Sequence, residues 1–195
     1  MNRKATVSRK TLETDITITL DLDGTGAYDV QTGVGFLDHM LTALAVHGLL
    51  DLEVKAVGDL HIDAHHTIED VGIVLGQALD KAAGNRQAIN RVGHAYVPMD
   101  EALGFVALDF SGRPYTVFDS TWTTSAIGQF PTDLVQHFFE SVAVHARLTL
   151  HASAQGRNDH HKAEAIFKAF ARALRVAAER DPRRSEVAST KGTLV

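Results

Sequence analysis

The sequence predicts an α/β fold: a two-layer sandwich made of two pseudo-symmetric repeats, each with a mixed, antiparallel-rich sheet and two helices. Two observations predict it. A set of motifs occurs twice along the 195 residues in the same order, and within each copy the apolar positions change from a period of two to a helical period. We divide the single domain, residues 1–195, into a first repeat at 1–93 and a second repeat with a C-terminal tail at 94–195.

The duplication is visible at three places along the chain. The shift between the copies changes only between elements, as insertions and deletions in loops would make it do. The second copy therefore has ten extra residues around positions 115–130 (98 − 88 = 10). The aligned segments are, in order, 13–24 with 101–112 (101 − 13 = 88), 39–58 with 137–156 (137 − 39 = 98), and 65–69 with 160–164 (160 − 65 = 95).

Each repeat begins with strands. Apolar residues alternate at Ile16, Ile18, Leu20 and Leu22, which is typical of a half-buried strand, and residues 105–110 repeat this pattern in the second copy. The short β-type run at 52–57 indicates a further strand between the two helices of the first repeat.

The helices follow from apolar residues at helical spacing. Residues 37–44 carry such a pattern before Gly48, and residues 68–82 carry the next before Gly84; both glycines are placed to end a helix. We therefore expect each repeat to run as two or three strands, a helix, a strand and a helix. Residues 85–98 are interpreted as the connection between the repeats.

The composition excludes several classes of protein. With 45% hydrophobic residues the chain can build a sizeable core, and a net charge of −5 argues against nucleic acid and anionic membranes as partners. No apolar run is long enough to span a bilayer, and the first residues lack the apolar segment of a secretory signal, which predicts a cytoplasmic protein. Without cysteine, the chain has no disulfide, thiolate nucleophile or sulfur-ligated metal.

The eleven histidines are unusually many, and their positions point to metal binding. Side chains four residues apart share one helix face, so His65 can bind a single ion together with Glu69, and His160 can do so with Glu164. A single HHxxE motif is a weak indication of metal binding, but its recurrence at equivalent positions of both repeats makes the indication strong.

The second histidine of each motif must serve another centre. His66 lies about 100° around the helix from His65, and His161 is placed in the same way in the second repeat. Two centres are thus implied. Each takes a His–Glu pair from one repeat and a lone histidine from the other, with His39 and His137 as the fourth donors.

The donor chemistry favours a particular kind of ion. A shell of imidazole nitrogens and a carboxylate without sulfur favours an octahedral Mn²⁺-like or Fe²⁺-like ion with open positions over closed tetrahedral zinc. For the histidines outside this pattern, His61, His94 and His151, we expect ordinary core roles. His47 recurs as His145 at the ends of the two shorter helices, where helix capping and substrate contact are equally open interpretations.

With these residues laid out, the sequence resembles the imidazoleglycerol-phosphate dehydratase family over essentially its full length. Many family members have Asp where this chain has Ala64, a position that is not a ligand. The segments that carry the resemblance are GVGFLDHML at 33–41, AHHTIEDVG at 64–72, DLVQHFFES at 133–141, NDHHKAE at 158–164 and STKGTL at 189–194.

The resemblance implies an enzyme of histidine biosynthesis. Members share a duplicated α/β sandwich, bind two manganese ions per subunit and assemble into cages of twenty-four subunits, with sites that form between neighbours. They dehydrate D-erythro-imidazoleglycerol phosphate to imidazole-acetol phosphate, a reaction explained by an imidazolate held between the two ions. Carried over to this chain, one ion would be held by His39, His66, His160 and Glu164, and the other by His65, Glu69, His137 and His161.

The resemblance also assigns substrate contacts. Glu13 would shuttle protons, the alternative being an ordinary exposed glutamate at a strand edge. Phosphate needs cationic and hydroxyl donors, although the polar tail from Asp181 onward would otherwise be expected to be disordered. The residues assigned to the substrate are His47, Arg91, Arg113, Lys168, Ser189, Thr190 and Lys191.

Two other classes of protein would use the same donors. A two-metal hydrolase would turn over phosphate esters or amides, and a metal-storage protein would bind ions without turnover.

Overall fold

The computed structural model describes residues 3–194. The first half of the chain comprises β1 (Lys4–Lys10), β2 (Thr14–Asp21), β3 (Tyr28–Gln31), α1 (Gly35–Gly48), β4 (Asp51–Gly58) and α2 (His65–Ala83). The second half comprises β5 (Val92–Met99), β6 (Ala102–Asp109), β7 (Tyr115–Asp119), β8 (Ala126–Ile127), β9 (Phe130–Pro131), α3 (Asp133–Ala146), β10 (Thr149–Gln155) and α4 (Asp159–Ala178).

The two halves have the same sheet topology, which confirms the predicted fold class. The strand order is β1-β2-β4-β3 in one sheet and β5-β6-β10-β7 in the other. In each, the first three strands are antiparallel and the last joins in parallel, β3 beside β4 and β7 beside β10. The small β8–β9 hairpin has no counterpart in the first half and lies in the ten-residue insertion that the sequence alignment indicates.

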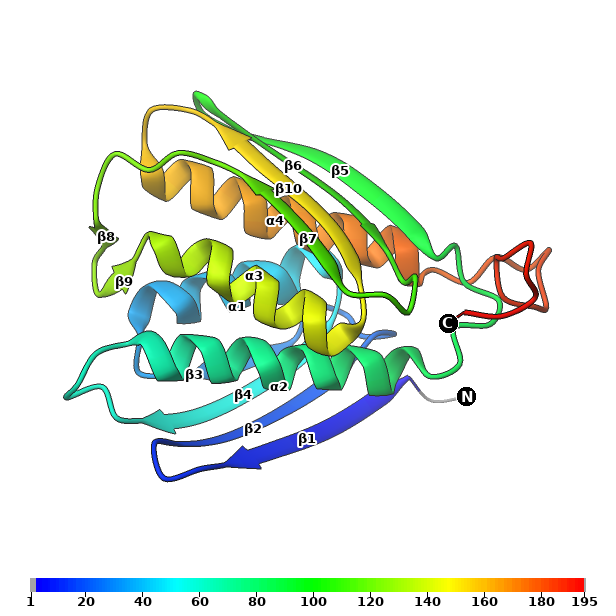
Figure 1. Ribbon diagram of the computed structural model, residues 1–195, viewed down its shortest axis with the longest axis horizontal. Coiled ribbons are helices and arrows are strands. Elements are labelled where there is room, and N and C mark those ends of the chain that lie inside the picture. The colour runs from blue at the N-terminus through cyan, green and yellow to red at the C-terminus, as the bar shows by residue number, and fades with distance from the viewer. Residues whose placement is uncertain (1–2, 195) are drawn as a thin grey trace.

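The helices lie between the two sheets (Figure 1). Each helix packs on the sheet of its own half, because its apolar face and the inward face of the sheet bury one another. The helices also pair across the halves: α2 packs along α3, and α1 packs along α4. Residues far apart in the sequence are thereby placed side by side at the centre of the molecule.

Two glycines allow α2 and α3 to approach closely. A Cβ atom on Gly72 would lie 3.0 Å from the Phe138 carbonyl oxygen, and one on Gly76 would lie 2.7 Å from the Val142 carbonyl oxygen. A larger residue at Gly76 would force the surrounding backbone to shift, and one at Gly72 would force a neighbour to give by a few tenths of an ångström. This close packing offsets the cost of glycine within a helix, about 1 kcal/mol relative to alanine. This close approach holds the first turns of both helices, which carry candidate ligands, against each other.

Two details of the predicted elements differ from the structure. Residues 92–98, expected in the connection between the repeats, belong to β5, whose outward residues alternate as Val92, His94 and Tyr96. Gly48 is still helical, and the left-handed residue that ends α1 is Leu49, with φ of 52°. Gly84 does adopt positive φ, 57°, directly after α2.

The three histidines expected in the core are exposed instead. His94 and His151 lie on the outward face of the second sheet, in register with Ala107 between them, and His61 lies in the turn before α2. Alternation along a strand does not tell which face is buried when both faces carry apolar residues.

The C-terminal tail folds back on the second half. The backbone N–H of Asp181 donates to the Ala88 carbonyl at 3.0 Å, and the Arg91 guanidinium donates to the Ala188 carbonyl at 2.6 Å. Among the described residues, no helix is both long and apolar enough to cross a membrane.

Candidate metal and substrate site

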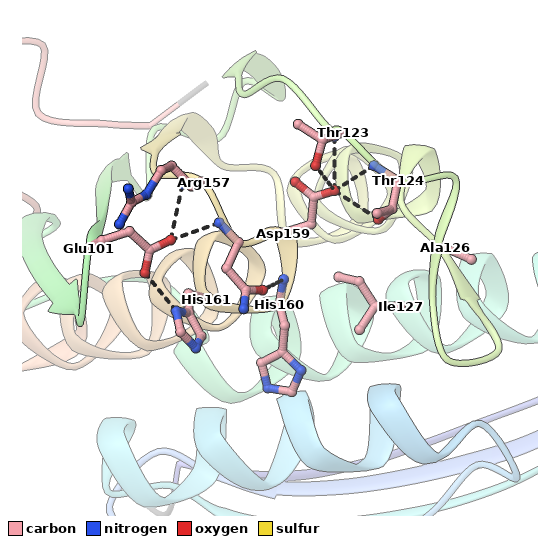
Figure 2. Close-up of a pocket in the computed structure, with 10 residues that line it drawn as sticks. Glu101, Thr123, Thr124, Ala126, Ile127, Arg157, Asp159, His160 and His161 are labelled. Carbon is pink, nitrogen blue, oxygen red and sulfur yellow. Dashed lines mark hydrogen bonds and ion pairs between the residues drawn. The ribbon is translucent and has the colours of Figure 1, made fainter.

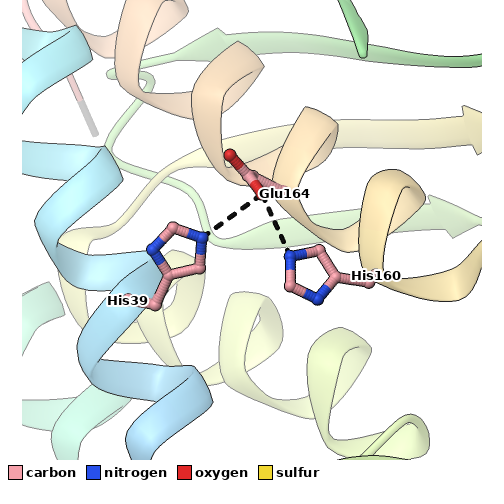
Figure 3. Close-up of side chains that lie close together, drawn as sticks. All are labelled: His39, His160 and Glu164. Atoms are coloured by element: carbon pink, nitrogen blue, oxygen red, sulfur yellow. Dashed lines mark hydrogen bonds and ion pairs between the residues drawn. The ribbon is translucent and has the colours of Figure 1, made fainter. Parts of the chain in front are cut away.

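The α1–α4 contact brings together His39, His160 and Glu164 (Figure 3). Glu164 Oε2 lies 3.3 Å from His39 Nε2 and 3.2 Å from His160 Nε2, and the carboxylate side chain is only 8% exposed. Its other oxygen, Oε1, lies 2.6 Å from Lys168 Nζ. The ring of Phe36 lies edge-on to both imidazole rings, with ring centres 6.4 Å from His39 and 5.0 Å from His160. We define these three donors as cluster 1.

Glu164 stays ionised in this setting. Burial is the largest single influence and raises its pKa, but the ammonium of Lys168 and the imidazole of His39 together hold the pKa below its ordinary value. A buried, ionised carboxylate flanked by two imidazole nitrogens is a donor set suited to a divalent cation.

The α2–α3 contact brings together His65, Glu69 and His137, which we define as cluster 2. Glu69 Oε1 lies 3.2 Å from His137 Nε2, and Oε2 lies 3.9 Å from His65 Nε2. The buried Nε2 of His137 has no correctly directed hydrogen bond among the described residues. An orphaned buried nitrogen that faces a carboxylate and a second imidazole fits a metal ligand better than a core residue.

The two clusters have the same types of donor at similar spacing. The ligand atoms within each lie within 4.8 Å of one another, and the donors are two imidazoles and one carboxylate in each case. Each cluster thus combines a His–Glu pair from one repeat with His39 or His137 from the other, and each is one donor short of the four expected from the resemblance.

The fourth expected donors lie outside these clusters in the described chain. The imidazole of His66 pairs with Asp59, with Nδ1 3.0 Å from Oδ2, and that of His161 pairs with Glu101, with Nδ1 2.8 Å from Oε2. These hydrogen bonds are the main cause that raises the pKa of each histidine above its ordinary value. Each imidazole is thus held by a carboxylate through Nδ1, and the Nε2 atom of His161 lies 3.8 Å from Asp100 Oδ2.

Glu13 lies at the tip of the β1–β2 hairpin and is 55% exposed. Its Oε2 is 3.9 Å from His66 Nδ1, too far for a hydrogen bond. The structure therefore places this carboxylate within ion-pair distance of one of the expected ligands, without a hydrogen bond to that imidazole.

Five of the seven expected substrate contacts line one pocket of about 350 Å³, formed where the tail folds back on the second half. Arg91 lines this pocket, and its guanidinium makes a two-point ion pair with Asp109, at 2.6 and 2.8 Å. The five expected contacts at this pocket are Arg91, Arg113, Ser189, Thr190 and Lys191, and the hydroxyl residues Ser111 and Thr193 line it as well.

The other two expected contacts, Lys168 and His47, lie beside cluster 1 instead. Lys168 forms an ion pair with Glu164, and the positive charges of Lys168 and Arg172 interact electrostatically with the imidazole of His47. Burial, and then those two cations, lower the pKa of His47, so the imidazole is neutral near pH 7. Within one chain, the expected substrate contacts are therefore divided between this pocket and the neighbourhood of cluster 1.

Three functional candidates were missed from the sequence. Asp59 and Glu101 hold the two lone histidines, and a pocket of about 630 Å³ opens beside His161 between Glu101 and the inserted segment (Figure 2). The sequence alignment of 13–24 with 101–112 already makes Glu101 the counterpart of Glu13, a signal that could have found it. Asp59 follows directly after β4 and carries no such signal.

Comparisons with known proteins decide the family. A family model described as imidazoleglycerol-phosphate dehydratase matches residues 32–174. The chain belongs to the imidazoleglycerol-phosphate dehydratase family. It is 58% identical to the family member from Chromobacterium violaceum over 98% of both chains, and 58% identical to that from Roseiflexus sp. over 98% of both chains.

Solved structures of the same family agree in fold. The imidazoleglycerol-phosphate dehydratase of Staphylococcus aureus superposes with a TM-score of 0.83 at 41% identity, covering 91% of this chain and 99% of the other. The Pyrococcus furiosus protein gives a TM-score of 0.83 at 37% identity, covering 96% of this chain and 100% of the other. The chain is therefore an enzyme of this dehydratase class, and family membership supports dehydration of imidazoleglycerol phosphate in histidine biosynthesis as its reaction.

Proposed function

We propose that the chain carries out this dehydration with two Mn²⁺ ions per subunit, one at each cluster. The observation that carries the proposal is the pair of three-donor clusters, each made of two imidazoles and a carboxylate, at the two helix contacts that join the repeats. His66 would complete cluster 1 and His161 would complete cluster 2.

We further propose that these two histidines come from neighbouring copies of the chain. In the described chain each is bound to a carboxylate of its own repeat, outside either cluster. At one contact between two subunits, the first subunit would receive His66 at its cluster 1 and give His161 to cluster 2 of the second. Repeated in a symmetric assembly, this contact would complete both clusters of every subunit. The twenty-four-subunit cage that the resemblance implies would be one assembly of this kind. The cytoplasmic location of the protein stays a prediction.

The substrate carries an imidazole ring, two adjacent carbons each bearing a hydroxyl group, and a phosphate. Bound Mn²⁺ would supply Lewis acidity toward the nitrogens of the substrate's ring, which assists loss of the hydroxyl next to the ring. Glu13 is the proton carrier in this proposal: it takes the proton from the second hydroxyl-bearing carbon, and the resulting enol becomes the ketone. Its exposed position on a hairpin tip lets it reach a substrate bound outside its own chain.

The phosphate would be held by the pocket that contains Arg113, Ser189 and Lys191. Arg91 is committed to Asp109 on two of its nitrogens, so we assign it mainly to shaping the pocket. Lys168 and His47, beside cluster 1, would contact the substrate from a different chain than the pocket does.

The direct test is incubation of the manganese-loaded protein with imidazoleglycerol phosphate, following the keto product by absorbance and free phosphate in parallel. We expect keto product without phosphate release, and loss of turnover after metal removal that Mn²⁺ restores. Phosphate release without keto product would favour the two-metal hydrolase, and bound metal without any turnover would favour metal storage.

A further inference from the structure

We propose that Asp59 and Glu101 are positioning residues, which set the tautomer of His66 and His161 so that Nε2 of each imidazole is a free metal donor. This inference rests on the proposed ligand roles of those two histidines. It assigns a task to two carboxylates that the proposed mechanism does not use.

The geometry of Glu101 shows how firmly it is held. Its Oε2 faces His161 Nδ1 at 2.8 Å, while Oε1 accepts the backbone N–H groups of Arg157 at 3.0 Å and Asn158 at 2.7 Å (Figure 2). A carboxylate oxygen without a proton can only accept, so the neutral imidazole must carry its hydrogen on Nδ1. Nε2 then presents its lone pair outward, as a ligand must.

Asp59 does the same for His66 but is held more loosely. Its Oδ2 faces His66 Nδ1 at 3.0 Å, whereas its buried Oδ1 has no hydrogen-bond partner among the described residues. The two imidazoles are therefore oriented alike, by carboxylates that differ in how they are themselves fixed.

The duplication shows that the two carboxylates are not counterparts. Glu101 corresponds to Glu13 (101 − 13 = 88), and Asp59 corresponds to Arg157 in the alignment that pairs Gly58 with Gly156 (157 − 59 = 98). In the second repeat the hairpin glutamate holds the histidine, and the residue matching Asp59 contributes only its backbone N–H.

In the first repeat the arrangement is reversed. Asp59 holds the histidine, and Glu13 stays 3.9 Å from it. The same hairpin position thus serves two purposes: in the second repeat it orients a ligand, and in the first it is released for proton transfer because Asp59 has taken over the orienting contact.

Glu101→Gln is a sharp test because the backbone fixes which way the new amide faces. Its carbonyl oxygen must stay on the N–H groups of Arg157 and Asn158, so its NH₂ group would point at His161 Nδ1 and donate to it. The imidazole would then carry its hydrogen on Nε2, the ligand atom. Asp59→Asn is free to turn, since Oδ1 has no fixed donor, and can still offer its oxygen to His66.

The measurement is Mn²⁺ affinity in the full-length protein, by chelator competition with free Mn²⁺ read by electron paramagnetic resonance. We expect Glu101→Gln to lower the affinity for one of the two Mn²⁺ ions by roughly 10- to 100-fold, the usual effect of losing a hydrogen-bond partner of a metal ligand. Asp59→Asn should weaken binding by less than about threefold, whereas Asp59→Ala should approach the effect of Glu101→Gln. Circular dichroism of each variant should match the wild type.

The matched control is Asp100→Asn. This carboxylate lies 3.8 Å from His161 Nε2 and is 78% exposed, so it shares the charge of Glu101 but does not touch Nδ1. Its variant should bind both ions as the wild type does. An equal loss in Asp100→Asn and Glu101→Gln would overturn the inference, because charge rather than tautomer would explain both.

The failure of the inference and that of the proposed function can be told apart with His161→Ala. If Glu101→Gln keeps wild-type affinity while His161→Ala loses an ion, the positioning role is refuted and the ligand assignment stands. If both variants keep two ions, the ligand assignment fails and the positioning role fails with it.

Discussion

Lys162→Met should destabilise the protein by removing one half of a buried ion pair at the start of α4. The side chains of Lys162 and Asp159 are only 2% and 3% exposed, and Nζ lies 2.8 Å from Oδ1. The ammonium also donates to the Thr121 carbonyl and lies 5.3 Å from the ring centre of Trp122. This pair anchors the inserted segment of the second repeat to the helix that carries His160.

The magnitude follows from what is left behind. Breaking a buried pair by removing one partner costs roughly 3–5 kcal/mol, because the remaining charge is uncompensated. Four donors from Thr123 and Thr124, at 2.7 to 3.0 Å, continue to hold Asp159 Oδ2. We therefore expect the lower end, a loss of about 3 kcal/mol in the free energy of unfolding, or roughly 6–12 °C in Tm for a domain of this size.

The assay is thermal and urea unfolding of the metal-free protein at fixed concentration. The double variant Asp159→Asn with Lys162→Met is the control, because it removes both charges and keeps an oxygen for the threonine donors; it should recover at least half of the loss. A free energy of unfolding within about 0.5 kcal/mol of wild type in Lys162→Met would mean that this ion pair does not stabilise the fold.

The pH dependence gives a second check on the same pair. Burial alone would raise the pKa of Asp159, but Lys162 and the donors of Thr124 and Thr123 hold the pKa well below its ordinary value. A carboxylate with a depressed folded-state pKa contributes stability above the unfolded-state pKa, about 3.9, and loses that contribution as the pH falls toward the folded-state value. The difference between wild type and Lys162→Met should thus be full at neutral pH and shrink as the pH falls below about 4.

Three further predictions concern the site. His66→Ala and His161→Ala should each lose a different manganese ion and abolish turnover, whereas His151→Ala, on the outward face of a sheet, should leave metal content and turnover nearly unchanged. Metal analysis together with turnover rates checks this. Full activity of either ligand variant in metal-limited buffer would contradict it. Glu13→Gln should keep both metal ions and lower kcat by roughly 10²- to 10⁴-fold, whereas Glu69→Gln should lower the metal content itself. A wild-type kcat in Glu13→Gln would show that Glu13 is an exposed glutamate without a catalytic role. Chelation should release smaller species in light scattering, and a fully active, metal-loaded monomer would argue against shared sites.

Much of the fold follows from the sequence because the signals are local. Alternation at Ile16 to Leu22 and helical spacing before Gly84 each concern a single element, and the internal duplication then carries the assignment to the second half. The strand β5 was missed because its outward side chains, such as Val92 and Tyr96, are partly apolar and its inward Gly93 has no side chain, so no clean alternation exists.

The pairing of the ligands is less local. Helical spacing gives His65 with Glu69, but nothing in the sequence tells whether His39 or His137 joins them, since that depends on α2 packing against α3. Only the resemblance to the family assigns His137 to the centre that contains His65 and Glu69. The carboxylates behind the lone histidines come from hairpin and loop positions, where contacts are set by the tertiary fold.

Subunit mixing would show whether each cluster of one chain is completed by a histidine of another chain. His66→Ala and His160→Ala both damage the centre built on cluster 1 and leave the other centre intact. When the two inactive variants are stripped of metal, mixed and reloaded with Mn²⁺, random pairing across chains should rebuild roughly a quarter of these centres and restore turnover accordingly. If the mixture stays as inactive as its components while each variant still assembles, the fourth ligand does not come from another chain.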